Sequence, residues 1–103
     1  MFDRLEDILA RYEELQAELS SPSLAGDSVR LRRLMKEQAE LAPLVEAYQE
    51  YKAARQDMQD SLAILEEEND EEMRELAKEE LAGAEGRTEE LEHRLKILLL
   101  PKD

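Results

Sequence analysis

The sequence has 103 residues, and its 27 acidic against 14 basic side chains give a formal net charge of −13. This charge argues against nonspecific binding to nucleic acids, DNA included, because such binding depends on a basic face that meets phosphates. The length allows one domain. With 4% aromatic and 40% charged residues there is little material for a thick core, so we expect helices that share narrow apolar seams.

The sequence contains no cysteine, which excludes disulfides and thiolate metal sites. Its uninterrupted apolar runs, such as Ile97 to Leu100, are far shorter than the roughly 20 residues that cross a bilayer. Phe2 is followed by charged residues, which fits no signal peptide. We therefore expect a cytoplasmic protein without membrane contact and without a cofactor.

A first helix is predicted over about residues 3–19. Its apolar residues recur at intervals of three and four, which places them on one side of a helix. Asp3 and Glu6 have the spacing of a capping box, in which each side chain accepts a hydrogen bond from a free backbone amide. The seam residues are Leu5, Ile8, Tyr12, Leu15 and Leu19.

A connecting loop follows from Ser20 to Ser28. It contains Pro22 and Gly26 among small polar residues, which is typical of a break between helices. Asp27 or Ser28 can cap the helix that comes next.

The second predicted helix is long and covers residues 28–67, about 60 Å at the helical rise. Pro43 lies inside it and removes one backbone donor. Because neither a glycine nor a capping residue flanks Pro43, we expect a kink there and not a break. Arg55 takes one place of the predicted seam. The apolar seam residues are Leu31, Leu34, Leu41, Leu44, Tyr48, Tyr51, Met58, Leu62 and Leu65.

A third helix is predicted over residues 70–99. Asn69 or Asp70 can cap it, and Glu71 and Glu72 lie in its first turn, where the helix dipole favours negative charge. Its seam is again spaced by threes and fours and consists of Ala77, Leu81, Ala84, Thr88, Leu91, Leu95 and Leu98.

Together these elements predict an all-α fold, an elongated antiparallel three-helix bundle from which a long helical hairpin projects. The first helix folds back on the start of the second, which places Leu15 near Arg33 and Leu5 near Pro43. The end of the third helix is level with that region. Beyond about Tyr48 the hairpin is expected to project for roughly 30 Å.

The turn of the hairpin, near residues 68 and 69, sets the expected register of its two helices. Tyr51 is then expected near Gly86 and Tyr48 near Glu89. The large rings would meet a stretch rich in small residues, which fills the seam without voids and gives the glycines of the third helix a packing role.

The acidic run from Glu66 to Glu80, at the tip of the hairpin, carries nine acids against two bases. Its carboxylates lack the alternate spacing and the glycine bend of a calcium loop, so a metal site is not favoured. A solvated, self-repelling surface is the simplest interpretation, and a basic protein partner or a metal ion is the alternative. The candidate protein-facing residues are Glu67, Glu71 and Glu75.

The start of the second helix carries the only basic patch of the sequence, which could contact RNA phosphates. The alternative is an exposed face whose charges pair with Glu37, Glu40 or the acids of a neighbouring helix. The candidate RNA-facing residues are Arg30, Arg32, Arg33 and Lys36.

No enzyme is predicted. His93 is the only imidazole, and it is expected to be exposed among acids, without a nucleophile or a pocket. Tyr12, Tyr48 and Tyr51 lie on seams, where packing is favoured over stacking on bases. A hydrolase with paired carboxylates would need strands or loops to hold the two acids in place, and none is predicted.

The sequence ends on an apolar run that three helices cannot bury. Ile97 to Leu100 are consecutive and point around the whole helix, and exposed apolar surface of this kind commonly marks a missing contact. We expect residues 1–100 to form one helical domain and residues 101–103 to begin a linker to a further domain. A fragment that stops here can also pair with its own copy.

Two motifs resemble those of a known family. "EEMRELAKEEL", Glu71 to Leu81, and "LKILLLPKD", Leu95 to Asp103, are similar to the N-terminal helical domain of bacterial peptide chain release factor 1, a class I translation termination factor. The resemblance covers essentially the whole chain. The second motif is the more specific, because it marks the passage into the next domain, where release factor 2 has a different sequence.

In that family the whole protein enters the ribosomal A site at a stop codon and promotes hydrolysis of peptidyl-tRNA. The Pro-x-Thr type decoding tripeptide and the Gly-Gly-Gln loop that serve these steps do not occur in this sequence. The resemblance therefore implies an accessory ribosome-docking domain near the GTPase-associated centre and its stalk-base protein. A stand-alone antiparallel coiled-coil scaffold or protein-interaction module is the alternative, which the bare apolar run disfavours.

Overall fold

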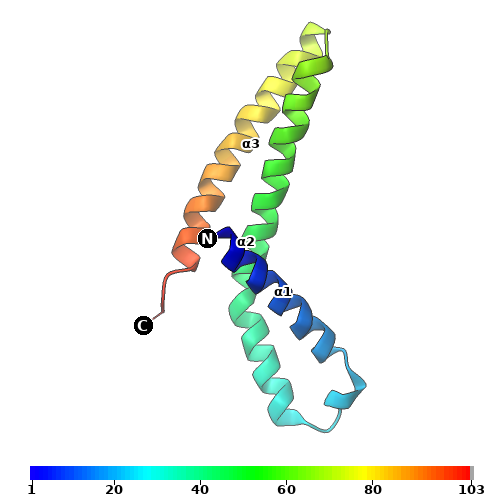
Figure 1. Ribbon diagram of the computed structural model, residues 1–103, viewed down its shortest axis with the longest axis vertical. Helices are drawn as coiled ribbons and strands as arrows, with labels where there is room; N and C mark the ends of the chain where they lie inside the picture. The colour runs from blue at the N-terminus through cyan, green and yellow to red at the C-terminus, as the bar shows by residue number, and fades with distance from the viewer. Residues whose placement is uncertain (103) are drawn as a thin grey trace. The chain divides into compact units, whose positions relative to one another are not determined.

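The computed structural model describes residues 1–102 and confirms the all-α class (Figure 1). The predicted helices differ from the observed ones by one residue at most at each end. In the described part of the chain there are three α-helices and no strand. Asp103, the last residue of the predicted linker, lies outside the described residues. The elements are α1 (Phe2–Leu19), the 3₁₀-helix η1 (Pro22–Leu24), α2 (Ser28–Glu67) and α3 (Glu71–Leu98).

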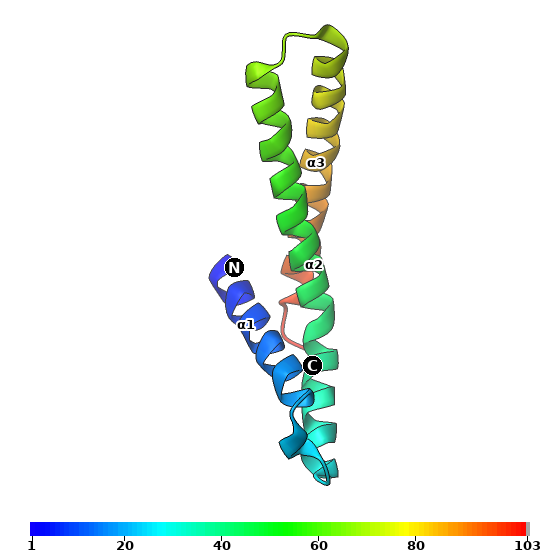
Figure 2. The same ribbon diagram turned by 90° about the vertical axis from the view of Figure 1, so that its right-hand side faces the viewer.

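The chain divides into two compact units, Met1–Glu46 and Ala47–Asp103. The first unit holds α1, η1 and the start of α2, and α1 lies back along α2 (Figure 1). The second unit holds the rest of α2 and α3, which form an antiparallel hairpin (Figure 2). As predicted, α2 continues through Pro43 without a break.

The start of α1 differs from the prediction. Met1 occupies the N-cap position, no side chain caps the helix, and the Met1 carbonyl accepts a hydrogen bond from the backbone of Leu5 at 3.1 Å. The predicted capping box of Asp3 and Glu6 is wrong, because Asp3 already lies inside the first turn and cannot reach back to a free amide. Its carboxylate still lies where the helix dipole favours negative charge.

The other two helix starts carry predicted caps. Asp27 accepts a hydrogen bond from the backbone amide of Arg30 at 3.0 Å. Asp70 accepts one from the amide of Met73, also at 3.0 Å. Each carboxylate satisfies a donor that the first helical turn leaves free, which confirms that short polar residues after the loops start α2 and α3.

The core of the first unit is a small leucine cluster. Leu15 of α1, Leu24 of η1 and Leu34 of α2 are buried together, and Leu19 and Leu41 pack against them. The turn of η1 brings Leu24 over the open end of the α1–α2 pair. One residue from each element thus closes the core.

An ion pair beside this core confirms the predicted register of the first unit. Arg11 Nε donates to Glu37 Oε2 at 2.6 Å, and Arg11 Nη2 donates to Glu37 Oε1 at 2.9 Å. These residues are level in the register that places Leu15 near Arg33. The hydrogen bonds from Arg11 hold the pKa of Glu37 below its usual value of 4.5, and they raise the pKa of Arg11.

This pair predicts an acid-dependent part of the stability. Because the pKa of Glu37 is lower in the folded than in the unfolded chain, the pair stabilises the fold above about pH 4.5. That contribution is lost as the pH falls through the folded pKa. We expect Glu37→Gln to lower the Tm at neutral pH and to flatten the fall of Tm below pH 4.5. Glu40→Gln, at an exposed acid on the same helix, is the control, and equal acid profiles of the two variants would contradict the prediction.

The buried side of the hairpin consists largely of small residues. The predicted seam of α3 is confirmed, with Ala77, Ala84, Thr88 and Leu95 buried. On α2 the buried stripe includes Ala54 and Ser61. The prediction had placed the seam one residue later, at Arg55 and Leu62. It was wrong there, because both side chains are exposed. Small side chains on both helices let the backbones approach closely, which favours Ser61 over the larger leucine beside it.

The predicted register of the hairpin was also wrong. The hydroxyl of Tyr51 donates to Glu92 Oε1 at 3.1 Å, so it does not lie at Gly86. Gly86 is exposed, and a Cβ added there would meet nothing within 4 Å, which removes the packing role proposed for the glycines. The position of a turn does not by itself fix the axial offset of two helices. Packing along the seam decides this offset. There the hydroxyl of Thr88 donates to Met58 Sδ at 3.4 Å.

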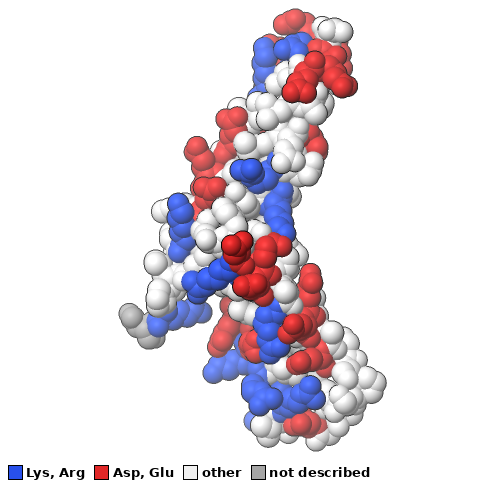
Figure 3. All heavy atoms as spheres, viewed as in Figure 1, with Lys and Arg blue, Asp and Glu red and all other residues white. Residues whose placement is uncertain are grey.

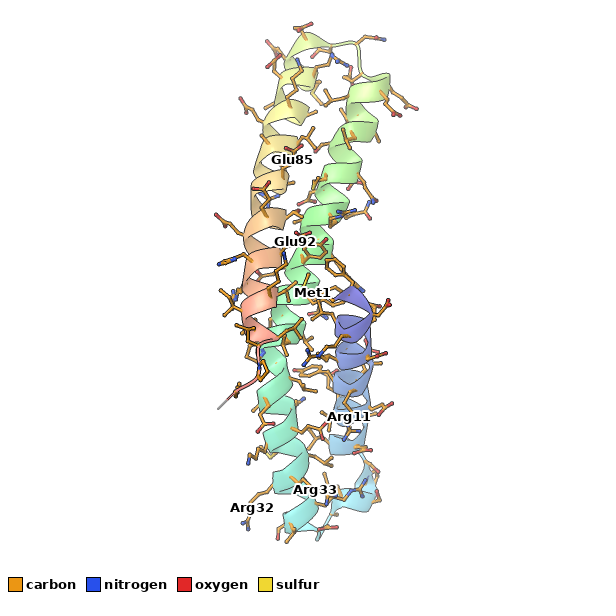
Figure 4. All side chains as sticks on the ribbon, turned by 60° about the vertical axis from the view of Figure 1, so that its left-hand side comes forward. Met1, Arg11, Arg32, Arg33, Glu85 and Glu92 are labelled. Atoms are coloured by element: carbon orange, nitrogen blue, oxygen red, sulfur yellow. The ribbon has the colours of Figure 1, made fainter. Side chains whose placement is uncertain are left out.

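Tyr48 and Tyr51 are buried, as predicted for seam residues. Their rings stack with centroids 6.4 Å apart. Burial, together with the hydrogen bond to Glu92, raises the pKa of Tyr51. The side of α3 that carries Glu92 faces α2 in Figure 4.

Candidate functional site

The loop that joins α2 to α3 is held by its own side chains. Glu68 Oε1 accepts hydrogen bonds from the backbone amides of Asn69, at 3.1 Å, and Asp70, at 3.0 Å. Asp70 in turn caps α3 through the amide of Met73. Carboxylates therefore satisfy three backbone donors around the turn, the amides of Asn69, Asp70 and Met73, which fixes its shape.

Arg74 ties the end of α2 to the start of α3. Its Nη1 donates to the carbonyl of Leu65 at 2.6 Å and to the carbonyl of Glu68 at 3.0 Å. The Leu65 oxygen belongs to the last turn of α2, and the Glu68 oxygen belongs to the residue directly after it, so no helical amide follows to bind either one. The sequence prediction missed this role, because nothing in the sequence separates a capping arginine from a solvated one.

Acidic side chains gather around this loop (Figure 3). We call residues 66–80 the acidic tip. Glu71 and Glu75 are exposed and lie one helical turn apart on the same side of α3, and Glu67 is exposed at the end of α2. Glu75 pairs with Lys78 at 3.2 Å, whereas Glu67 and Glu71 form no ion pair with another described residue. The tip thus keeps most of its negative charge uncompensated.

Within the acidic tip and directly before it, the hairpin exposes large apolar side chains that the sequence prediction did not assign to any surface. They are Ile64 of α2 and Met73 and Leu76 of α3, and they line a hollow of about 400 Å³ between the two helices. The sequence held a signal for them, because none of the three falls on a predicted seam.

The basic patch lies near the start of α2 and splits into two rows. Arg32 and Lys36 are exposed and lie one turn apart on one side of the helix, while Arg30 and Arg33 lie three residues apart beside them. Arg32 projects from α2 on the side away from α1 (Figure 4). Within residues 1–102 none of the four forms an ion pair. Glu37, one of the acids named as partners in the alternative interpretation together with Glu40 and the acids of a neighbouring helix, is bound by Arg11.

The described residues contain no group of His, Cys, Asp and Glu side chains placed to hold a metal ion. His93 is exposed, as expected. No helix in the described part of the chain combines the length and the apolar character that crossing a membrane requires.

The sequence pattern of the PCRF domain matches residues 8–103. The chain belongs to the PCRF domain family.

Curated relatives agree with this family over the whole chain. Peptide chain release factor 1 of Agathobacter rectalis is 61% identical over 103 residues, that of Lachnoclostridium phytofermentans 52%, and that of Bacillus cytotoxicus 48%. Each match covers 100% of this chain and 29% of the relative, and it lies in the N-terminal region. No solved structure matches the chain. The resemblance inferred from the two motifs is thus confirmed.

The candidate residues of this PCRF domain fall into different units. The basic patch belongs to the unit Met1–Glu46 and the acidic tip to the unit Ala47–Asp103. Each surface therefore has to be understood by itself. Both are built on helices whose positions are fixed locally, the patch by the leucine cluster and the tip by Arg74 and Asp70.

Proposed function

We propose that this PCRF domain is the noncatalytic N-terminal domain of a peptide chain release factor and serves translation termination by docking to the ribosome in the cytoplasm. The chain spans 29% of the length of relatives that are named peptide chain release factor 1. The decoding tripeptide and the Gly-Gly-Gln loop do not occur in its sequence. We therefore assign stop-codon reading and peptidyl-tRNA hydrolysis to other parts of such a protein.

The observation that carries the docking proposal is a pair of opposite, internally uncompensated charged surfaces. Glu67 and Glu71 at the acidic tip and Arg32 and Lys36 in the basic patch have no ion-pair partner among the described residues. A ribosome presents both RNA phosphates and basic proteins. RNA repels an acidic surface that a basic protein attracts, so charge orients the domain more than it adds affinity.

On these grounds we assign the acidic tip to a basic protein and the basic patch to RNA. The family resemblance points to the stalk-base protein of the GTPase-associated centre as the protein partner. Long-range attraction of this kind acts mainly on the association rate and weakens as salt rises.

The triple variant Glu67→Lys, Glu71→Lys and Glu75→Lys tests the tip in a release factor that carries this chain. We expect ribosome association to slow by about tenfold at low salt and the difference to shrink as salt rises. Termination rates at limiting factor should fall in parallel. Rapid-mixing measurements of association and of peptide release, made over a range of salt concentrations, give both quantities.

A charge-matched control separates position from net charge. Glu85→Lys, Glu89→Lys and Glu90→Lys change the charge by the same amount on exposed residues of α3 outside the tip (Glu85 is marked in Figure 4). In a third arm, Arg32→Ala with Lys36→Ala should reduce the salt dependence of binding by roughly one phosphate contact for each side chain. Unchanged rates and salt dependence in the tip variant, or equal losses in the control, would reject the proposal.

A further inference from the structure

The hairpin does not bury all of its apolar side chains in the acidic tip and directly before it. Ile64 is 42% exposed, Met73 46% and Leu76 59%. Single exposed apolar residues are common, but these three come from both helices and line one hollow together with Ser61 and Ala77. The hollow has a volume of about 400 Å³.

Two further hollows continue this one on either side. The hollow on the α3 side measures about 380 Å³ and shares Leu76 and Glu79 with the central hollow. The hollow on the α2 side measures about 400 Å³ and shares Ile64. We call the three together the tip groove. Its centre is apolar and its two edges are acidic.

Most acids along the edges are not neutralised within the domain. Glu67 on the α2 edge and Glu71, Glu72 and Glu79 on the α3 edge form no ion pair with another described residue. The edge acid Glu75 is paired with Lys78. A ligand that presents an apolar stripe between basic side chains would match both the centre and the edges.

The groove is formed before any ligand arrives. Arg74 binds the carbonyls of Leu65 in the last turn of α2 and of Glu68 in the loop, and Asp70 caps α3. These bonds hold the two walls in place at the loop, so binding would cost little ordering of the groove itself.

We propose that the tip groove binds an amphipathic helix of a basic protein, with two or three apolar side chains one turn apart seated on Ile64, Met73 and Leu76. Lysines and arginines beside that stripe pair with Glu67 on one edge and with Glu71 and Glu79 on the other. The proposal deepens the docking function and rests on it only for the statement that the partner belongs to the ribosome.

A helix fits this groove better than an extended peptide does. Both walls are α-helices, whose backbone groups are bonded within each helix, so no strand edge is offered to an extended chain. A helix needs no such edge, because it satisfies its own backbone and binds through side chains. RNA is excluded from the groove by the acidic edges, which repel phosphates.

A second copy of this chain is the competing occupant. Its acids would face the acidic edges, except at the basic patch, where Val29 and Met35 are exposed near Arg32. Contact between the patch of one copy and the groove of another joins two different surfaces and would give a reciprocal dimer, a ring or an open chain. The net charge of −13 opposes such association.

The test uses two synthetic peptides of about four helical turns that contain the same leucines, lysines and arginines. In one peptide the leucines form a single stripe, and in the other they are spread around the helix. We expect the striped peptide to bind the chain at least tenfold more tightly, measured by fluorescence anisotropy. Leu76→Ser with Met73→Ser should lower its affinity about tenfold. Val29→Ser with Met35→Ser, the matched pair outside the groove, should leave the affinity unchanged.

Circular dichroism of each variant checks that the helices persist, which is expected because the changed residues are exposed. Equal binding of the two peptides, or an affinity that falls with the tip charge reversals and not with Leu76→Ser and Met73→Ser, would overturn the proposal. Light scattering that shows self-association of the chain, abolished by the groove variant, would assign the groove to a second copy and overturn the proposal as well.

Failure of this proposal differs from failure of the docking function. If ribosome association responds to the tip charge reversals while both peptides bind alike, the docking function stands and the groove proposal is wrong. If the striped peptide binds in the groove while ribosome association is unchanged in every tip variant, the groove stands and its assignment to the ribosome is wrong.

Discussion

Leu15→Ala is expected to lower the free energy of unfolding by about 2–5 kcal/mol. Leu15 is fully buried and joins α1 to Leu24 and Leu34, so its truncation leaves a cavity at the point where three elements meet. The whole stability of a chain of this size is about 5–15 kcal/mol. One side chain therefore accounts for a large share of it.

Urea unfolding followed by far-UV circular dichroism measures this loss. Leu31→Ala is the matched control, since Leu31 lies on α2 in the same unit and is exposed, so its predicted place on the seam was wrong. It should change the stability by no more than about 0.5 kcal/mol. Similar losses in the two variants would show that the leucine cluster is not the core of the first unit.

The second large effect concerns the seam of the hairpin. Ala84 is fully buried on α3, on a buried side that it shares with Ala77 and Thr88. Ala84→Leu forces a larger side chain into this close contact, which pushes α3 away from α2 and should cost about 1–3 kcal/mol. A drop in Tm and in the midpoint of urea unfolding is the expected result.

Ala82→Leu provides the control for this change. Ala82 lies on the same helix and is exposed, so the same substitution there adds no volume to the seam. Its effect should stay within about 0.5 kcal/mol. If both variants are equally stable, the two helices are not in close contact through small residues.

The sequence by itself determined the local features of this protein. Apolar spacing and loop residues located the helices, and Asp27 and Asp70 cap α2 and α3 as predicted. These features depend on neighbouring residues along the chain, so they can be read without a structure. The predicted register of the first unit was correct as well, as the ion pair between Arg11 and Glu37 shows. The motif around Leu95 to Asp103 identified the family.

The tertiary structure decided which of two adjacent stripes on α2 is buried and how far α3 is displaced along it. A period of 3.6 residues fits Ser61 nearly as well as Leu62, and only close packing against α3 selects the smaller side chain. The same displacement pairs Tyr51 with Glu92. Ile64, Met73 and Leu76 are exposed because they lie outside the buried stripes of α2 and α3. The apolar spacing leaves these three residues off the predicted seams, but their assembly into the tip groove depends on contacts between residues that are distant in the sequence, which local patterns do not encode.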